Sequence, residues 1–437
     1  MSGIKLITKY ADKYINKIDL LNIEDKLRNA HEILHRQEGL CNNGAEWIDY
    51  PTKVSDLELN NIISIASKAR EKNAFIVIGI GGSYLGARAA ISALTHTFYN
   101  QLGKDRTGNP EIYFAGYNID PDYLLELLEI INHKDVVINV ISKSGTTFET
   151  LLAFRHLKEA LITKYGEEEA LSRIIVTTGD KGLLRDYTNK YDLVSLPISD
   201  NISGRYSVLS TVGLLPMAVA GINIRKVMEG AKEQALEMKD FRMDHPSYLY
   251  AAIRYLLYQS GKKIEVFSYY KEKLRYFAEW YKQLFAESEG KEGKGLFPTS
   301  LMFTTDLHSL GQLLQSGDKT FMQTSLVIKN SIEMKIKDDN DDLGNLNYLA
   351  GVSYNEILNC VKNGVVNAHY SGDSPNLMIE LESLDEKTIG KLFYFFQKSC
   401  ALSSLLLELN PFNQPGVEEY KREIKINLDT ICERDKK

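Results

Sequence analysis

Short apolar runs alternate with amphipathic segments along the chain from Ala74 onward. The apolar runs have the length of buried strands, and the segments between them repeat apolar residues with a helical period. Strands are expected near residues 74–79, 111–115, 135–141, 173–177 and 192–196. Helices are expected near residues 84–97, 121–131, 147–165 and 181–187. This alternation predicts an α/β protein whose strands form a parallel sheet with right-handed crossovers.

A second alternating block follows after an apolar helical stretch at 208–232. Its expected strands are 263–267, 301–304, 321–327 and 377–381, and its expected helices are 270–285, 309–314, 350–368 and 385–409. Residues 1–50 are interpreted as peripheral helices, and residues 415–434 as a charged amphipathic helix. The glycine-rich, charged segment 286–298 is expected to be a mobile loop, and the acidic segment 337–345 a solvated loop.

A cluster of polar side chains follows the apolar run that ends at Ile141. Hydroxyl and ammonium groups occupy five positions, which are Ser142, Lys143, Ser144, Thr146 and Thr147. A helical pattern comes next, and Thr146 and Glu149 have the spacing of a capping box. Strand, polar loop and helix N-terminus in this order favour a phosphate site, because free N–H groups and the helix dipole meet the hydroxyls there. The alternative is a surface loop that is merely rich in Ser and Thr.

A second turn, rich in glycine, follows the first apolar strand. Gly79 and Gly81 fit the dinucleotide-binding pattern G-x-G-x-x-G, but Tyr84 stands at its last position. A Walker A loop also fails, because Ala87 stands where that motif needs Lys. The turn is therefore either a simple tight turn or a place where backbone approaches a ligand closely.

Composition narrows the class of protein. The 437 residues are 44% hydrophobic and 25% charged, which is typical of a soluble globular chain of two or three domains. A net charge of −6 argues against general nucleic-acid binding. Four widely spaced cysteines without a Cys-x-x-Cys pair favour free thiols in a reducing cytoplasm. No signal sequence is recognisable, and the apolar runs are too short to span a membrane.

Four further segments carry residues suited to sugar-phosphate chemistry. Arg205 lies beside a glycine in 203–207, Glu287 at a helix end in 283–288, and His308 after a strand end in 304–309. Gln414 and Lys421 lie at the start of the last helix. Each residue alone is more typical of a surface ion pair or a structural role. Pattern alone does not bring these distant residues into one site.

Taken together, the motifs resemble the glucose-6-phosphate isomerase family in its short bacterial form. The matching segments keep the family's order and span nearly the whole chain, and they are 79–86, 142–147, 203–207, 287–288, the His308 segment and 414–421. Three departures concern Ser203 and Ala286, where the family commonly has Gly and Met, and the acidic pair Glu289 and Glu292.

The resemblance implies an architecture and a reaction. It implies two SIS (sugar isomerase) domains, each a parallel five-stranded sheet flanked by helices. We expect an N-terminal helical segment at 1–50, a first SIS domain at 51–220, a bridging helix at 221–244 and a second SIS domain with the C-terminal helix at 245–437. The implied protein is a cytoplasmic homodimer without cofactor or metal. It would interconvert glucose 6-phosphate and fructose 6-phosphate through an enediolate.

The resemblance also assigns roles to residues. Ser142, Lys143, Ser144 and Thr147 would hold the substrate phosphate, and Gly82 and Ser83 would lie against the sugar. Arg205 would stabilise the enediolate, and Glu287 would move the proton between C1 and C2. His308, donated by the partner subunit, and Lys421 would assist ring opening, with Gln414 nearby. The chemistry agrees, because a carboxylate can serve as base and Arg stays charged beside a developing oxyanion.

Other functions remain to be weighed against this one. A related isomerase could also epimerise mannose 6-phosphate or act on an aminosugar phosphate. An amidotransferase is disfavoured, because the first cysteine is Cys41. A SIS-type sensor that only binds sugar phosphates would need 142–147 but not Glu287, His308 and Lys421. An oxidoreductase is disfavoured by Tyr84.

Overall fold

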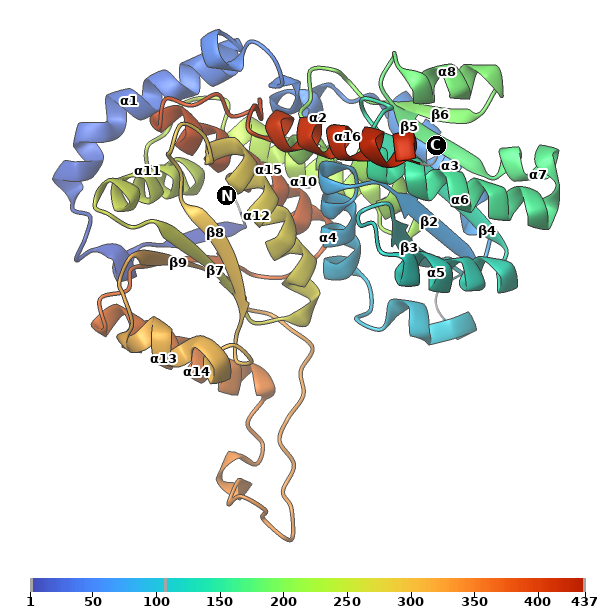
Figure 1. Ribbon diagram of the computed structural model, residues 1–437. Helices are drawn as coiled ribbons and strands as arrows, with labels where there is room; N and C mark the ends of the chain where they lie inside the picture. The colour runs from blue at the N-terminus through green and yellow to red at the C-terminus, as the bar shows by residue number, and fades with distance from the viewer. Residues whose placement is uncertain (1–2, 106–107, 435–437) are drawn as a thin grey trace.

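The computed structural model describes residues 3–105 and 108–434, which form two five-stranded sheets with helices on their faces (Figure 1). The first sheet has the strand order β3-β2-β4-β5-β6, and all its strands are parallel. Its strands are β2 (Ala74–Ile78), β3 (Glu111–Ala115), β4 (Val136–Ser142), β5 (Ile174–Thr178) and β6 (Val194–Pro197). The predicted α/β class and all five predicted strands of this sheet are confirmed.

Alternate side chains of the first sheet enter two separate cores. Phe75 and Val77 of β2 face the large core that contains helices α3 (Asp56–Arg70), α4 (Leu85–Leu94) and α9 (Thr211–Val219). Ile76 and Ile78 face the other side, toward α5 (Pro121–His133), α6 (Phe148–Tyr165), α7 (Glu167–Ser172) and α8 (Leu183–Lys190). Because both faces are covered, β2, β4 and β5 are buried at every position and are largely apolar, with Asn139 of β4 as a polar residue inside the run.

The strand order creates a crevice. The chain passes from β2 to β3 on one side and then returns to β4 on the other side of β2. Ligands of open α/β sheets bind at such a switch point, beyond the carboxyl ends of the strands. The glycine turn follows β2 and the polar loop follows β4, so the fold places both predicted motifs at this crevice.

The second sheet has the order β1-β10-β9-β7-β8 and is not wholly parallel, which corrects our expectation. Strands β7 (Ile264–Tyr269), β8 (Phe297–Met302), β9 (Phe321–Ile328) and β10 (Asn376–Leu381) are parallel, whereas β1 (Ile4–Ile7) pairs antiparallel with β10. Residues 1–50 are therefore not entirely helical, although they contain the helix α1 (Lys17–Arg36). β1 has four residues and a partner distant in sequence, so periodicity could not reveal it. It covers an otherwise open sheet edge.

Helices of the second block also lie on both faces of their sheet. Phe267 of β7 packs into the large core with α11 (Pro246–Gln259), α12 (Arg275–Glu289) and α15 (Glu386–Leu406). The adjacent Val266 faces α13 (Leu307–Ser316), and α14 (Tyr354–Ser371) packs on the same side (Figure 1). The last described helix, α16 (Val417–Arg434), is exposed along most of its length.

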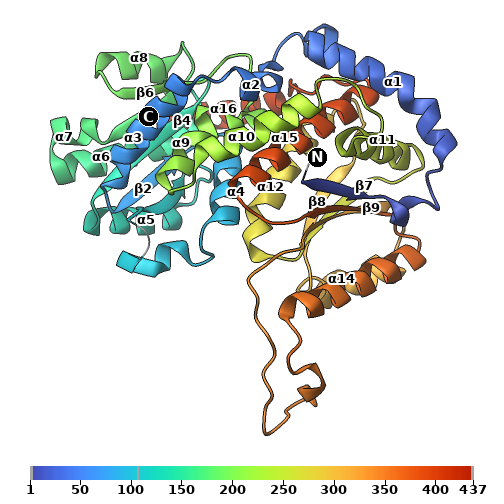
Figure 2. The same cartoon turned by 180° about the vertical axis from the view of Figure 1, so that it is seen from behind.

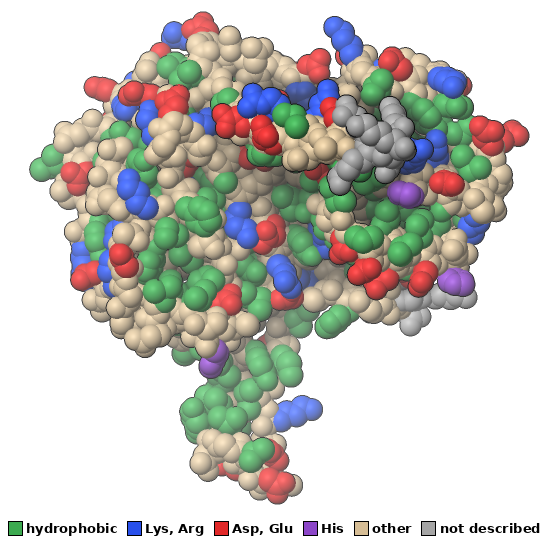
Figure 3. Space-filling view, in the orientation of Figure 1, with side chains coloured by type: hydrophobic (Ala, Val, Ile, Leu, Met, Phe, Trp, Pro, Cys, Tyr) green, Lys and Arg blue, Asp and Glu red, His purple; other side chains and the backbone are tan. Residues whose placement is uncertain are grey.

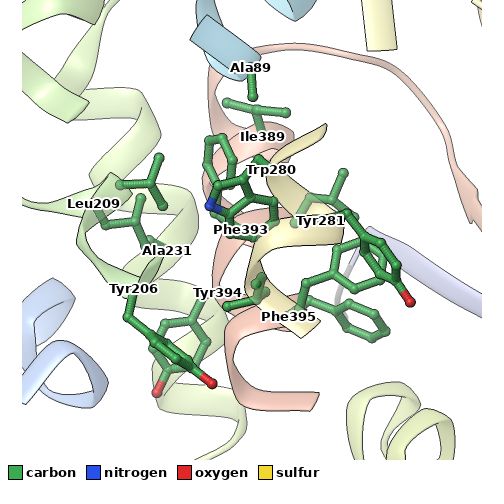
Figure 4. Close-up of a cluster of buried hydrophobic side chains, with 14 of the residues drawn as sticks. Ala89, Tyr206, Leu209, Ala231, Trp280, Tyr281, Ile389, Phe393, Tyr394 and Phe395 are labelled. Atoms are coloured by element: carbon green, nitrogen blue, oxygen red, sulfur yellow. The ribbon is translucent and has the colours of Figure 1, made fainter. Parts of the chain in front are cut away.

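Aromatic side chains join the two halves of the molecule in one core. Figure 4 shows Trp280 of α12 beside Phe393 of α15, with a ring separation of 4.8 Å. It also shows Tyr206 near Tyr394, and Trp47 packs against both of these rings. Residues from the N-terminal segment, the first block and the second block thus share one continuous core.

An arm made of residues 329–353 projects from the body after β9 and returns at α14 (Figures 1 and 2). Several apolar side chains on it are exposed, including Ile332 (91%), Leu343 (85%) and Tyr348 (79%). The expected acidic loop, 337–345, lies within this arm and is largely exposed. None of the helices in the described ranges is both long and apolar enough to cross a membrane.

Two glycines allow α15 to cross α10 (Ile224–Glu237) in close contact. A Cβ atom at Gly390 would lie 1.9 Å from the Val227 carbonyl oxygen, and one at Gly230 would lie 1.9 Å from that of Lys387. Backbone atoms cannot move aside as flexible side-chain ends can. The crossing therefore depends on the absence of a side chain at both positions.

We predict that Gly390→Ala lowers the free energy of unfolding by about 1–3 kcal/mol, the usual cost of overpacking. Gly364→Ala is the matched control, because Gly364 lies in α14 and a Cβ atom there would meet nothing within 4 Å. Alanine should stabilise that exposed helix by up to about 1 kcal/mol. Urea unfolding followed by circular dichroism compares the two variants, and equal effects would contradict the close crossing.

Candidate active site

The candidate site lies where the crevice of the first sheet meets the end of α12. The glycine turn contains the 3-10 helix η4 (Gly81–Ser83), which packs against a second one, η6 (Gly204–Leu209). A Cβ atom at Gly82 would lie 2.1 Å from the Gly204 carbonyl oxygen, and one at Gly81 would lie 2.8 Å from Gln283 Nε2. The glycines of this turn therefore allow two backbone segments and helix α12 to meet.

The polar loop 142–147 is organised around one buried hydroxyl. Ser142 is 2% exposed, and its Oγ accepts a hydrogen bond from the Gly145 N–H at 3.1 Å. The same oxygen shares a hydrogen bond with Thr147 Oγ1 at 3.0 Å. Gly145 has φ +66°, so the loop turns back on itself at a residue that tolerates this conformation. Hydroxyl groups thereby gather at the start of α6.

The predicted capping box of Thr146 and Glu149 is wrong. Thr147 is the N-cap of α6, and among the described residues no side chain caps this helix. Thr146 Oγ1 instead donates to Ser144 Oγ at 3.1 Å. The first N–H groups of α6 consequently keep their capacity to bind an anion, which strengthens the physical case for a phosphate site here.

Lys143 does not direct its ammonium group toward these hydroxyls. Its Nζ donates to the carbonyl oxygens of Asp200 and Ile202, at 2.6 and 3.0 Å. Burial lowers the pKa of this amine. The side chain thus ties the polar loop to the segment that leads into η6, a contact that the sequence pattern did not predict.

Arg205 is the centre of the site. Its side chain is 1% exposed and its guanidinium donates five hydrogen bonds. Nε donates to Ser288 Oγ at 2.8 Å, and Nη1 donates to Glu287 Oε2 and Gln414 Oε1, both at 3.1 Å. Nη2 donates to the carbonyl oxygens of Pro411 and Asn413, at 2.5 and 3.0 Å. The structure therefore brings Arg205, Glu287 and Gln414 together.

Tyr206, the residue after Arg205, holds this arginine in place. Tyr206 is 1% exposed, and its ring stacks on Trp47 at a centroid separation of 4.9 Å. Gln397 of α15 donates to the Tyr206 carbonyl oxygen at 2.8 Å. The N-terminal segment and α15 thus fix the backbone from which the guanidinium extends.

Glu287 is held on both carboxylate oxygens. Oε2 accepts from Arg205, and Oε1 accepts from Gln283 Nε2 at 2.9 Å. The side chain remains 33% exposed, so it borders both a buried cation and open space. A carboxylate in this position can exchange a proton with a bound molecule.

The segment 286–298, predicted to be a loop throughout, is a loop only between α12 and β8. Helix α12 continues through Glu289, which is 1% exposed, and the loop that follows is anchored by two lysines. Lys291 Nζ donates to the carbonyl oxygens of Asn410 and Ser288, and Lys294 Nζ donates to that of Leu407. Burial and the charge of Arg205 lower the pKa of Lys291 to about 8.

His308 and Lys421 are not brought to this cluster within one chain. His308 is exposed on α13, which covers the face of the second sheet opposite α12 (Figure 1). Lys421 lies on α16 with its side chain 54% exposed and pairs with Glu418 at 2.8 Å. Within the described ranges, no hydrogen bond or ion pair joins either residue to Arg205 or Glu287.

Sequence reasoning missed several contributors to the site. Gln283 lies four residues before Glu287 on one helix, a spacing that places both side chains on the same face and could have revealed it. The carbonyl groups of Pro411 and Asn413 leave no such signal, because every residue has a carbonyl. Ser288, which lies in the motif at 287–288, is fully buried and accepts a hydrogen bond from Arg205.

Comparisons with known proteins agree with one another. The profile of a family described as phosphoglucose isomerase matches residues 64–433. Glucose-6-phosphate isomerases of Alkaliphilus metalliredigens and Fusobacterium nucleatum are 46% and 45% identical over 426 residues, covering 97% of this chain and 95% of each relative. The crystal structure of a glucose-6-phosphate isomerase from Chlamydia trachomatis has the same fold, with a TM-score of 0.80 at 19% identity, covering 99% of this chain and 90% of that one. The matched span includes every candidate site residue.

We predict that Thr147→Ala weakens the binding of inorganic phosphate by about 1–3 kcal/mol, the value of a hydrogen bond to a charged group. Thr163→Ala, an exposed position on the same helix, is the control and should leave the affinity unchanged. Isothermal titration of phosphate into each variant measures the difference. Equal affinities in the two variants would remove Thr147 from the anion site.

Proposed function

The chain belongs to the phosphoglucose isomerase family and interconverts glucose 6-phosphate and fructose 6-phosphate, and on this premise we propose roles for its residues. In this proposal Glu287 carries the proton between C1 and C2 of the substrate, and Arg205 stabilises the enediolate. The observation that carries it is the 3.1 Å contact between Glu287 Oε2 and the buried Arg205 guanidinium. Glycolysis and gluconeogenesis both use this reaction.

The geometry supports the two roles on physical grounds. The reaction removes a proton adjacent to a carbonyl, and the electron pair moves onto the carbonyl oxygen. A carboxylate with one face open to a ligand can accept that proton. Arg205 cannot lose its own proton, and its five hydrogen bonds fix its position before the substrate arrives. A preorganised cation of this kind needs no reorganisation as the negative charge develops.

The loop 142–147 would hold the phosphate of the substrate. Ser142, Ser144 and Thr147 supply hydroxyls, and the uncapped start of α6 supplies N–H groups. Gly82 and Ser83, in the adjoining turn, would lie against the sugar. We assign Lys143 a supporting place, because its amine already binds two carbonyl groups of the chain. A phosphate anchored at this loop would position the reacting carbons through remote binding energy.

We propose that the ring-opening groups are completed by a second copy of the chain. His308 is exposed and distant from Glu287 in its own fold, so it would reach the site of a partner in a homodimer. Lys421 and Gln414 would act beside it. The exposed apolar side chains of the arm support such an interface, because soluble proteins rarely leave large apolar patches uncovered (Figure 3).

The organisation and location of the protein complete the proposal. We propose a division into a segment at 1–50, a first SIS domain at 51–220, a bridge at 221–244 and a second SIS domain at 245–437. This division is supported because one sheet lies before the bridge and the other after it in the sequence. The exception is β1, which comes from the segment 1–50 but joins the second sheet. A cytoplasmic location is proposed, because the phosphorylated sugars of glycolysis are cytoplasmic metabolites.

We predict that Glu287→Gln lowers kcat by roughly 10²–10⁴-fold, the usual range for loss of a general acid–base group, with little effect on phosphate binding. A coupled assay with fructose 6-phosphate measures the loss. Glu292→Gln, an exposed carboxylate in the next loop, is the control and should retain activity. Deuterium incorporation from solvent at C2 provides a second measurement. Incorporation at the wild-type rate in Glu287→Gln would show that another group moves the proton.

The dimer proposal predicts complementation between two inactive chains. His308→Ala and Glu287→Gln chains, expressed together, should form mixed dimers in which one site is intact and the other carries both changes. Random pairing makes about half of the dimers mixed, so roughly a quarter of wild-type activity should return by the symmetry of such an interface. If mixed dimers form but activity stays at the mean of the two variants, His308 does not cross the interface.

A further inference from the structure

The last turn of α12 lies between two fully buried arginines. Arg205 contacts Glu287 and Ser288 from the side of the crevice. Arg254 of α11 contacts the next residue, Glu289, from the opposite side, with Nη1 donating to Glu289 Oε1 at 2.5 Å. Both arginine side chains are 1% exposed. Three consecutive residues of one helix end are thus held by two cations that do not contact the same atoms.

Arg254 is itself fixed to the second sheet. Its Nε donates to Glu265 Oε2 at 2.6 Å, and its Nη1 also donates to Ser403 Oγ of α15 at 2.9 Å. Glu265, at the start of β7, in turn accepts hydrogen bonds from Tyr250 and from Thr324 of β9, at 2.8 and 2.7 Å. The contacts therefore run from two central strands through Glu265 and Arg254 to Glu289.

This arrangement is costly for a protein core. The cluster holds two carboxylates and one guanidinium, and Arg254 Nη2 is buried without a hydrogen-bond partner. Replacing buried ion pairs by apolar residues of similar volume is often neutral or stabilising. A stability role alone is therefore a poor explanation for three ionisable groups at this place. Because these groups lie behind Glu287, the proposed base, their position indicates a functional role.

We propose that the buried Arg254–Glu289 ion pair is a positioning device that fixes the last turn of α12 and thereby the direction of Glu287. The proposal rests on the role of Glu287 proposed above. Helix ends lack intrahelical partners for their last carbonyl groups and fray easily, and Glu287 lies only two residues before the end of α12. Residues at i and i+2 point to different sides of a helix, so Glu289 can be anchored in the core while Glu287 faces the crevice. Arg254 and Glu289 touch no substrate in this arrangement and act only through Glu287.

Glu289→Ala tests the device directly. It leaves Arg254 paired with Glu265 and Ser403, so no buried charge loses every partner. We expect kcat to fall about 10–100-fold, because a displacement of about 1 Å at a reacting group can cost two orders of magnitude, while KM stays within about twofold. Glu289→Gln keeps an acceptor oxygen at the same reach and should recover part of the lost kcat. Glu111→Ala is the matched control, because Glu111 is also a buried, ion-paired carboxylate but lies at the amino end of β3, away from the crevice.

Two double variants separate positioning from a general loss of structure. In an Arg254→Met background, Glu289→Ala should lower kcat by no more than about twofold further, since the pair is already broken. In a Glu287→Gln background, Glu289→Ala should leave the residual proton exchange at C2 unchanged, because no base remains to be positioned. If Arg254→Met does not fold, the Glu287→Gln background and the single Glu289 variants still test the positioning role.

The outcomes distinguish failure of this proposal from failure of the role given to Glu287. A wild-type kcat in Glu289→Ala would overturn the positioning role. An equal loss of kcat on adding Glu289→Ala to the wild-type chain and to the Glu287→Gln chain would overturn it too. A raised KM at constant kcat would overturn it as well. Wild-type proton exchange in Glu287→Gln alone would instead overturn the assignment of the base.

Discussion

The buried guanidinium of Arg205 is the contact on which the geometry of the whole site depends. It receives Glu287 and Ser288 from α12, Gln414 from the start of the last segment, and two carbonyl groups from the loop after α15. Burying a charge is costly unless it is paired and hydrogen-bonded. Here one carboxylate pairs with it, and neutral oxygens take up the remaining donors. The same contacts that lower the cost of burial also hold the Glu287 carboxylate against the guanidinium.

That arginine can reach these partners only because the backbone around it is closely packed. Gly82 and Gly204 bring η4 against η6, and any side chain at Gly82 would collide with the Gly204 carbonyl. Lys143 ties the polar loop to the residues before η6, and Tyr206 is held by Trp47 and Gln397. The polar loop 142–147, which follows a strand of the first sheet, and Glu287 of α12 are thereby held relative to each other through these intermediate contacts. The single continuous core lies behind this arrangement.

The sequence predicted what depends on local pattern and missed what depends on distant partners. Strands β2, β4 and β5 of the first sheet are buried at every position, β3 is buried at four of its five positions, and their apolar runs revealed them. The edge strand β6 is mostly exposed, with Leu196 as its buried residue. The polar loop at 142–147 was located from side-chain type and from its place between a strand and a helix. β1 was missed because a strand of four residues is too short to show a hydrophobic period. The predicted capping box was wrong because Thr147, not Thr146, is the N-cap residue of α6. The partners of Arg205 were not predictable in the same way. Two of them are backbone carbonyls, and the others lie about 80 and 200 positions along the chain, so only the folded core brings them together.

The residues given roles by resemblance fall into two groups in the structure. Arg205, Glu287, Gln414 and the loop 142–147 are positioned by the core of a single chain, whereas His308 and Lys421 stand on exposed faces of α13 and α16. Proton transfer and stabilisation of the enediolate need preorganised groups within a few tenths of an ångström, which a buried network can provide. Ring opening needs only an acid and a base near the ring oxygen and its hydroxyl, and in the proposed homodimer the surface helices would supply them. In the proposed mechanism, Arg205 and Glu287, the groups for proton transfer, are linked within one chain, and assembly of two chains would bring His308 to the groups that open the ring.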